Sequence, residues 1–384
     1  MTTRGEQAKR VLVLSFSSLR TDPRVRRQIE LLRRNYDVTA VGFDCPDGLS
    51  VRCRAIPDRH WPGAIKAVAA LQLACGADES AYRLSRCVQG TQAALRDANF
   101  DLIVANDIWT LPLALELKGA AKVLFDAHEY SPLEFEESWK WRFFFQRFNE
   151  HMCRRYMPRV DAATTVCEGI AQEYRRTTGV NMAIVQNAPP YHELSPRATE
   201  PGRVRMIHHG ATIASRRLEC MIEVMDLLDE RFELDLMLIP NESSYFRGLE
   251  QAVARRPRVR IVPPVPMTEL PRCLNQYDVG LFLLPPANFN YRHALPNKFF
   301  EFVQGRLAVA IGPSPEMARL VRQYDCGIIA DDFSPRAMAD RLHRLDHDRI
   351  DHYKRQSHIA ARELCFEKSA DVLLSTVRKL VGDA

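Results

Sequence analysis

Three ionisable side chains follow a short apolar run in the first half of the chain. The run covers 121–125, and Asp126, His128 and Glu129 come directly after it. Polar residues at the carboxyl end of a buried parallel strand lie where such folds bind their ligands. An imidazole beside carboxylates can move protons or position a reacting group. We therefore predict that His128 and Glu129 are catalytic; a histidine that only packs in the core is the alternative.

A third acidic residue is expected in the same place. Asp107 follows the apolar run 102–105, which also has the length of a strand. Because neighbouring parallel strands end at the same edge of a sheet, Asp107 is expected beside His128. The sequence thus indicates Asp107 as a third catalytic residue.

A short helix in the second half of the chain carries groups suited to a nucleotide. Asn297 is expected as its N-cap, the helix runs from Lys298 to about Gln304, and Gly305 ends it. A helix amino terminus binds anions through its free N–H groups and its dipole. Glu301 can accept hydrogen bonds from two vicinal ribose hydroxyls; a surface helix with a solvated glutamate is the alternative.

A loop at the start of the second half adds positive charge. Gly210, after the run 204–208, permits a tight turn. Arg216 and Arg217 are expected at the start of the following helix, where a guanidinium can bind a diphosphate with two hydrogen bonds. A loop with two solvated arginines is the alternative.

The scaffold that must position these residues alternates apolar runs of strand length with helical stretches, which predicts an α/β fold with parallel sheets covered by helices. A polar segment at 192–202 with two prolines and a glycine is typical of a linker. It divides the chain into predicted domains 1–195 and 203–355, with helical 356–384 at the end. Ligands of such folds bind in the cleft between the domains.

Composition excludes several classes of protein. The net charge of +5 over 384 residues is too weak to indicate a nucleic-acid binder. Ten scattered cysteines contain no C-x-x-C pair, which argues against zinc fingers and predicts reduced, packed thiols in a cytoplasmic protein. No apolar stretch reaches the roughly 18 residues of a membrane span.

Residues 139–148 interleave aromatic and basic side chains. Such a helix can lie on an anionic membrane, which would make the protein peripheral on the inner face of the membrane. It can equally be an amphipathic helix packed on the first domain, with arginines that reach the solvent.

Four motifs together resemble group 1 (family 4) glycosyltransferases. They occur in the family's order at Thr21–Gln28, Asp126–Pro132, Val166–Ile170 and Leu295–Glu301. The resemblance implies a GT-B fold, with two Rossmann-like domains facing across a cleft and a C-terminal helix crossing back to the N-terminal domain. Domain 1–195 would bind the acceptor and domain 203–355 a nucleotide-sugar donor. The resemblance also implies retention of anomeric configuration, without a metal or other cofactor.

Three residues match functional positions of that family. Glu301 matches the second glutamate of its Glu-x7-Glu motif, which binds the ribose. Arg216 falls where the family has a diphosphate-binding arginine or lysine. His128 matches the histidine that faces the donor sugar, and we expect a neutral imidazole that positions the sugar.

Two departures from the family pattern concern the donor. His293 stands where the first glutamate of the motif contacts the transferred sugar, and Ala211 stands where an arginine is common. We expect Arg292, Lys298 or Arg217 to supply the missing charge. The predicted donor-binding set is Gly210, Arg216, Arg292, His293, Asn297, Lys298 and Glu301.

The sequence therefore predicts a transferase that moves a sugar from a nucleoside-diphosphate sugar to a glycan, lipid-linked or small-molecule acceptor, as in polysaccharide biosynthesis. A pair of carboxylates at glycosidase spacing is not required, because the departing phosphate oxygen can take the acceptor's proton. Two alternatives stay open: a sugar-nucleotide epimerase of the same fold, and a non-catalytic nucleotide-sugar-binding partner, which His293 suggests.

Overall fold

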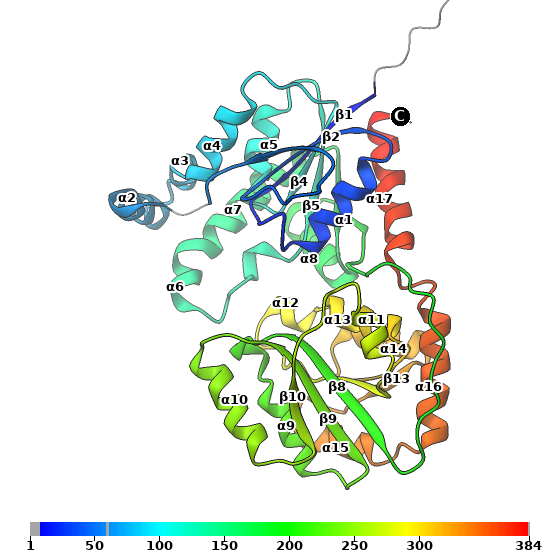
Figure 1. The fold of residues 1–384 in the computed structure, drawn as a ribbon. Coiled ribbons are helices and arrows are strands. Elements are labelled where there is room, and N and C mark those ends of the chain that lie inside the picture. Colours follow the sequence, from blue (N-terminus) through cyan, green and yellow to red (C-terminus); the bar gives the residue numbers. More distant parts are fainter. Residues whose placement is uncertain (1–7, 59–60, 383–384) are drawn as a thin grey trace, which may run out of the picture. The chain divides into compact units, whose positions relative to one another are not determined.

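The computed structural model describes residues 8–58 and 61–382, which divide into two units. The first unit contains the chain up to Val185, Asn288–Asn290 and the residues from Ala370 onward. The second contains Gln186–Ala287 and Tyr291–Ser369, so the predicted linker at 192–202 lies inside it. Each unit is built on its own parallel sheet (Figure 1).

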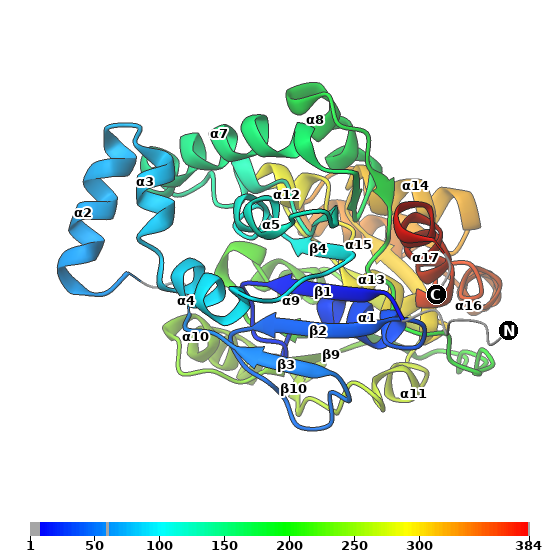
Figure 2. The ribbon, with the colours of Figure 1, turned by 90° about the horizontal axis from the view of Figure 1, so that it is seen from above.

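The first sheet has seven parallel strands in the order β3-β2-β1-β4-β5-β6-β7. Figure 2 shows β1, β2 and β3 side by side. The strands are β1 (Arg10–Ser15), β2 (Asp37–Gly42), β3 (Arg52–Ala55), β4 (Leu102–Asn106), β5 (Lys122–Ala127), β6 (Ala162–Thr165) and β7 (Ala183–Ile184). Strand order reverses between β1 and β4, which is where open α/β sheets bind ligands. In the register of β4 and β5, Asn106 pairs with Asp126, so their polar ends are aligned.

Helices accompany this sheet in alternation with its strands. They are α1 (Pro23–Leu32), α2 (Gly63–Ala74), α3 (Asp78–Arg83), α4 (Arg86–Leu95), α5 (Leu111–Leu117), α6 (Trp139–Trp141), α7 (Arg147–Tyr156) and α8 (Glu168–Thr178). A π-helical turn, Arg142–Gln146, joins α6 to α7. α2 and α3 project from the margin of the unit (Figure 2). The sequence predicts a single helix over 79–97, but the chain breaks it into α3 and α4.

The second sheet has six parallel strands in the order β10-β9-β8-β11-β12-β13. They are β8 (Val204–Ala211), β9 (Phe232–Ile239), β10 (Val259–Val262), β11 (Val279–Phe282), β12 (Ala308–Ile311) and β13 (Gly327–Ile329). Its helices are α9 (Glu219–Asp226), α10 (Ser244–Ala254), α11 (Leu270–Leu274), α13 (Asn297–Gln304), α14 (Pro315–Tyr324), α15 (Pro335–Leu342) and α16 (His347–Ala360). The short helix α12 (Phe289–Arg292) is divided between the two units. The last helix, α17 (Phe366–Val381), begins in the second unit and continues in the first from Ala370, as predicted for the C-terminal helix.

The central strands are buried on both faces, which explains their unbroken apolar runs. In β1, every residue of Val11–Leu14 has 0% exposure. The strand ends are polar instead: Ser15, Asn106 and Asp126 are buried at the carboxyl ends of β1, β4 and β5. A buried polar group is costly unless it is hydrogen-bonded, so such residues mark a place where the sheet must build a polar network.

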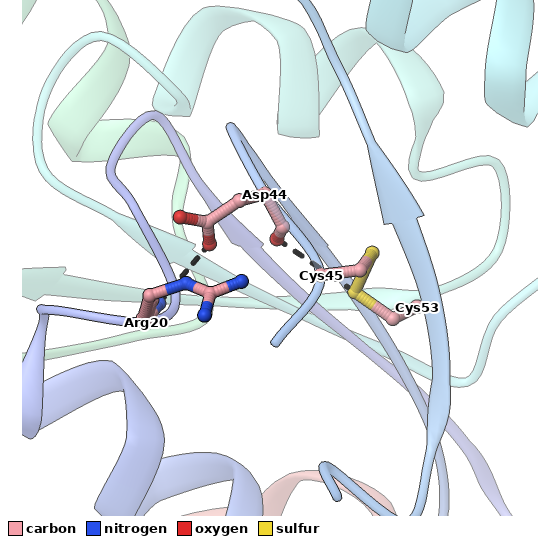
Figure 3. Close-up of a disulfide and its surroundings, with 4 residues drawn as sticks. All are labelled: Arg20, Asp44, Cys45 and Cys53. Carbon is pink, nitrogen blue, oxygen red and sulfur yellow. Dashed lines mark hydrogen bonds between the residues drawn. A yellow bond between two sulfur atoms is a disulfide. The ribbon is translucent and has the colours of Figure 1, made fainter. Parts of the chain in front are cut away.

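Two of the ten cysteines correct the expectation of reduced thiols. Cys45, in the loop after β2, forms a disulfide with Cys53 in β3 (Figure 3). Asp44, next to it, accepts a hydrogen bond from the backbone N–H of Arg20 at 3.0 Å. The disulfide therefore restrains the loop after β2, and Asp44 in this loop contacts the segment between β1 and α1.

Candidate active site

Asp126 anchors a buried network at the end of β5 and is only 2% exposed. It accepts hydrogen bonds from Arg24 through Nε at 2.8 Å and Nη2 at 2.6 Å. Gln28 donates at 3.2 Å and Thr164 at 2.6 Å. Burial would raise the pKa of Asp126, but the Arg24 guanidinium outweighs it and lowers that pKa well below its usual range. Asp126 is thus an ionised anchor and not a proton donor at neutral pH.

The start of α1 places Arg24 for this contact. Asp22 is the N-cap, and its side chain accepts from the backbone N–H groups of Arg24 and Val25, with Pro23 at the first helical position. Arg24 and Gln28 are four residues apart and so lie on one face of the helix. Neither residue was predicted as a site residue, although the i, i+4 spacing of two polar residues after a strand is a signal that marks them.

His128 lies among the polar ends of β4 and β5. Its backbone N–H donates to Asp107 Oδ1 at 2.9 Å, and its ring Nδ1 is 3.3 Å from Asp107 Oδ2. On the other side, Nε2 is 3.1 Å from Asn106 Oδ1 and 3.6 Å from Asp126 Oδ2. The predicted proximity of Asp107 and His128 is confirmed, and Asn106 is a further member that the sequence did not reveal.

These neighbours determine the charge of His128. Burial alone would lower the pKa of the imidazole, but Asp107 and Asp126 together raise it to about 9. His128 is therefore an imidazolium at neutral pH, with both ring nitrogens as donors. The expectation of a neutral imidazole is wrong, because the two carboxylates outweigh the cost of burying a cation.

Asp107 and Glu129 differ in how the backbone holds them. Asp107 has a φ of 62°, a left-handed conformation that aspartate tolerates better than most residues. Strained backbone of this kind clusters at functional sites. The side chain of Asp107 is 43% exposed, so it can reach a substrate while it contacts His128. Glu129 is exposed, and its carbonyl oxygen accepts from the Tyr174 hydroxyl at 2.9 Å.

In the second unit, Lys298 at the start of α13 is buried, with 6% exposure. Its Nζ lies 3.1 Å from His208 Nε2 and 4.4 Å from the centre of the Phe282 ring. Burial lowers the pKa of Lys298 well below its ordinary value, Arg216 lowers it further, and Glu301 opposes both. An arginine, a buried lysine and a helix amino terminus thus share one place, and a bound polyanion would favour the protonated form of the lysine.

Glu301, one turn further along α13, faces His209. Its Oε2 is 3.4 Å from His209 Nε2, and Glu301 is 5% exposed. The alternative of a solvated surface glutamate is therefore wrong. Burial, followed by the charge of Lys298, lowers the pKa of His209 to about 3, so this histidine is neutral.

Gly210 lies within β8 and not in the tight turn that the sequence predicts. Its φ is +124°, and a Cβ there would lie 3.4 Å from Lys298 Nζ. Only glycine adopts this backbone without strain and leaves the lysine its room.

Two arginines after β8 lie differently from the prediction. Arg216 ends a single 3-10 turn, Ala214–Arg216, and is half-buried. Arg217 has a left-handed φ of 51°, and its side chain forms an ion pair with Glu219 at 3.6 Å. The helix begins only at Glu219, so the expected helix start at Arg217 is wrong.

Two further predicted donor residues flank α13. Asn297 is the first residue of the helix rather than its cap, because the N-cap is Pro296, which has no side chain able to cap. Arg292 is exposed at the end of α12. Gly305 ends α13, as predicted.

Residues 21–189 match the glycosyl transferase 4-like domain family. The first unit therefore carries a glycosyltransferase domain of the group 1 type. This confirms the resemblance that its motifs carry. No curated protein sequence matches the chain significantly.

Solved structures share the GT-B fold with this glycosyltransferase at low sequence identity. Sucrose-phosphate synthase from Thermosynechococcus elongatus has a TM-score of 0.74 at 12% identity, over 97% of this chain and 99% of its own. HepE of Anabaena, solved with UDP-glucose, has a TM-score of 0.70 at 11% identity, over 97% and 100%. TarM of S. aureus, solved with UDP, has a TM-score of 0.61 at 11% identity; 76% of this chain spans only 59% of TarM. These likenesses show the fold.

The departure from the family motif at His293 has a neighbour that the sequence did not reveal. His293 Nδ1 lies 4.0 Å from Oε1 of Glu316, in the first turn of α14. A carboxylate thus stands beside the position where the family motif has one. The pair Pro315-Glu316 begins α14, the helix that follows β12.

No helix within residues 8–58 and 61–382 is long and apolar enough to cross a membrane. Nor does that part of the glycosyltransferase hold three histidine, cysteine, aspartate or glutamate side chains grouped as metal ligands.

Proposed function

We propose that this glycosyltransferase moves a sugar from a nucleoside-diphosphate sugar to an acceptor hydroxyl with retention of anomeric configuration. The observation that carries the proposal is the buried Lys298 beside Arg216 at the amino terminus of α13. A diphosphate would pair with Arg216 and favour the protonated form of Lys298, and Glu301 would accept from the ribose hydroxyls. The UDP-glucose bound to HepE, a structure of the same fold, supports a donor of this class.

The proposed reaction balances without a protein base. The bond between the anomeric carbon and the phosphate oxygen breaks, and the acceptor oxygen bonds to that carbon. The acceptor's proton passes to the departing phosphate oxygen. Arg216 and Lys298 stabilise the charge that the diphosphate gains, and such preorganised electrostatic stabilisation is often the largest part of catalysis.

In this proposal the first unit binds the acceptor and holds the transferred sugar. The Nε2–H of the His128 imidazolium faces Asn106, and its Nδ1–H, 3.3 Å from Asp107, would donate to a sugar hydroxyl; the half-exposed carboxylate of Asp107 would accept from a hydroxyl. The role assigned to Glu129 is to orient the acceptor from the exposed end of the same loop. Glu316 takes the place of the glutamate lost at His293, and their 4.0 Å separation supports this substitution.

We also propose peripheral membrane contact through 139–148. Trp139 is 66% exposed and Phe143 is 61% exposed, and Lys140 and Arg142 are exposed between them. Apolar rings flanked by cations suit the surface of an anionic bilayer. Flotation with anionic vesicles should recover the protein, and Trp139→Ser with Phe143→Ser should abolish recovery. Recovery of the double variant at the wild-type level would contradict the contact.

Metal independence and cytoplasmic location stay predictions. A chelator should leave the transfer rate unchanged, and a rate restored only by added Mg²⁺ or Mn²⁺ would contradict the first. The Cys45–Cys53 disulfide opposes the second, because such bonds are rare in cytosolic proteins.

The test is a panel of nucleotide sugars, with release of nucleoside diphosphate measured in the presence and absence of acceptors. Acceptor-dependent release supports transfer. Conversion of the donor to its epimer without an acceptor would support the epimerase. Donor binding with neither reaction would support the non-catalytic partner.

A further inference from the structure

An aromatic pocket lies in the first unit, separate from the network around Asp126. Its volume is about 360 Å³, which is in the range of small-molecule sites. Most of its lining side chains are aromatic, and a cation, a carboxylate and an amide complete it: Trp61, Trp109, Phe135, Trp141, Phe145, Lys66, Glu134 and Asn149. We call this set the aromatic pocket.

The rings of the pocket form flat, mutually supported walls. Trp61 stacks on Phe145 with centroids 6.3 Å apart and planes 14° apart. Trp109 meets the edge of Trp61 at 6.0 Å and lies 4.7 Å from Phe148 beneath it. Such walls offer an apolar face of fixed orientation to a ligand.

Two buried polar atoms of the pocket residues have no hydrogen-bond partner among the described residues: Trp61 Nε1, a donor, and Asn149 Oδ1, an acceptor. Asn149 is 1% exposed, and its Nδ2 donates to the carbonyl of Ser131 at 2.8 Å, which fixes the amide orientation. An unpaired buried polar atom is costly, so a ligand that pairs both atoms would gain binding free energy.

The pocket adjoins the His128 site through one loop. Asp107 contacts His128, and Trp109 lines the pocket two residues later in the same connection from β4 to α5. Thr110 fixes this loop, because its hydroxyl donates to the carbonyls of Asn106 and Asp107, both at 2.9 Å. A molecule in the pocket can therefore extend to the side chains proposed to handle the sugar.

We propose that the aromatic pocket binds a pyranose ring of the acceptor, which is therefore a carbohydrate with at least one sugar beyond the reacting residue. This inference rests on the proposed function. A pyranose has an apolar C–H face for the aromatic walls and hydroxyls that both donate and accept, so it pairs Trp61 Nε1 and Asn149 Oδ1 at once. An alkyl or prenyl chain would fill the same walls and leave both atoms unpaired, which disfavours a lipid tail here.

The test measures binding of methyl glycosides of glucose, galactose, mannose and N-acetylglucosamine to the full chain by saturation-transfer NMR, without nucleotide or vesicles. We expect at least one glycoside to bind. Trp61→Phe keeps the ring and loses the N–H, and should weaken binding by about five-fold or more. Phe145→Leu, which removes a wall, should weaken it similarly. Trp139→Phe is the matched control, since Trp139 lies outside the pocket, and it should bind as wild type.

Three outcomes would overturn the inference: no glycoside binds at tens of millimolar, Trp61→Phe binds as tightly as wild type, or the pocket takes only an alkyl detergent such as dodecylphosphocholine. Folding of each variant is checked by circular dichroism and by its melting temperature, because the pocket lies in the first unit and UDP is assigned to the second. Donor turnover is measured in parallel. Turnover without glycoside binding would contradict the sugar site in the pocket and would not contradict the proposed transfer. Glycoside binding without turnover of any donor would contradict the proposed transfer and not the sugar site.

Discussion

Two histidines, half-buried His128 in the first unit and buried His209 in the second, differ in charge: the first is an imidazolium and the second is neutral. His128 in the first unit has its pKa raised to about 9, whereas His209 in the second has its pKa lowered to about 3. Burial lowers the pKa of both, so burial does not explain the difference. The carboxylates of Asp107 and Asp126 surround the first histidine, and the ammonium of Lys298 lies near the second.

This contrast teaches how one residue type serves two kinds of ligand. A histidine held between carboxylates becomes a fixed donor for a neutral, hydroxyl-rich group. The neutral histidines beside Lys298 add no positive charge that would repel the lysine, so the site can still attract an anion. The division of labour in the proposed transfer follows from these neighbours.

The largest expected effect is the loss of turnover on substitution of His128 in the first unit. His128→Ala should lower turnover by about 10²-fold or more, because a positioned donor to the sugar is lost. UDP affinity should stay at the wild-type level, because the diphosphate is assigned to the second unit. Turnover and calorimetric titration with UDP check this. A variant that is destabilised but fully active would show that His128 only packs.

The charge of His128 should also appear as pH-dependent stability. A pKa raised from 6.5 to about 9 corresponds to about 3 kcal/mol of stabilisation, present in full below pH 6.5 and lost as pH rises through 9. Urea unfolding between pH 6 and pH 10 measures it. His128→Gln, which cannot be protonated, should remove most of this slope; an identical slope in the variant would assign it to other groups.

In the second unit, we expect the substitution of Arg216 to weaken UDP binding. Arg216→Ala should weaken UDP binding by roughly 1.5–3 kcal/mol, the contribution of a hydrogen bond to a charged group. Arg217→Ala is the matched control and should change little, because that side chain pairs with Glu219. Equal affinities of both variants and the wild type by calorimetry would remove Arg216 from the site.

A smaller effect, on the KM for the donor, is expected on substitution of Glu316. Glu316→Gln keeps the shape and removes the charge beside His293. We expect about a ten-fold rise in KM for the donor, the effect of roughly 1.4 kcal/mol, with UDP affinity unchanged since the contact is to the sugar. A loss of UDP affinity instead would place Glu316 at the nucleotide.

Much of the fold was predictable because its signals are local. Apolar runs marked the central strands, Asp22 and Pro23 marked the start of α1, and Gly305 marked the end of α13. The short edge strand β3 and the exposed helix α2 were missed, since neither has a buried run or a strong apolar face.

The site was predictable in its positions but not in its charges. The strand ends gave Asp107 and His128, and the first turns of α13 gave Lys298 and Glu301. The charge of His128 depends instead on long-range neighbours, such as Asp126, which Arg24 keeps ionised from about a hundred residues away in sequence. No local pattern reports such a pairing, and the same is true of Glu316 beside His293.

The contrast between the two sites is tested most directly by an NMR titration of the protein labelled with ¹³C at histidine Cε1, with His128→Gln and His209→Gln to assign the signals. We predict that the His128 signal titrates near pH 9 and that the His209 signal stays that of a neutral ring down to about pH 3. Titration of His128 near 6.5 would contradict the account, because the imidazole would then be neutral where the proposed mechanism needs a donor on both nitrogens.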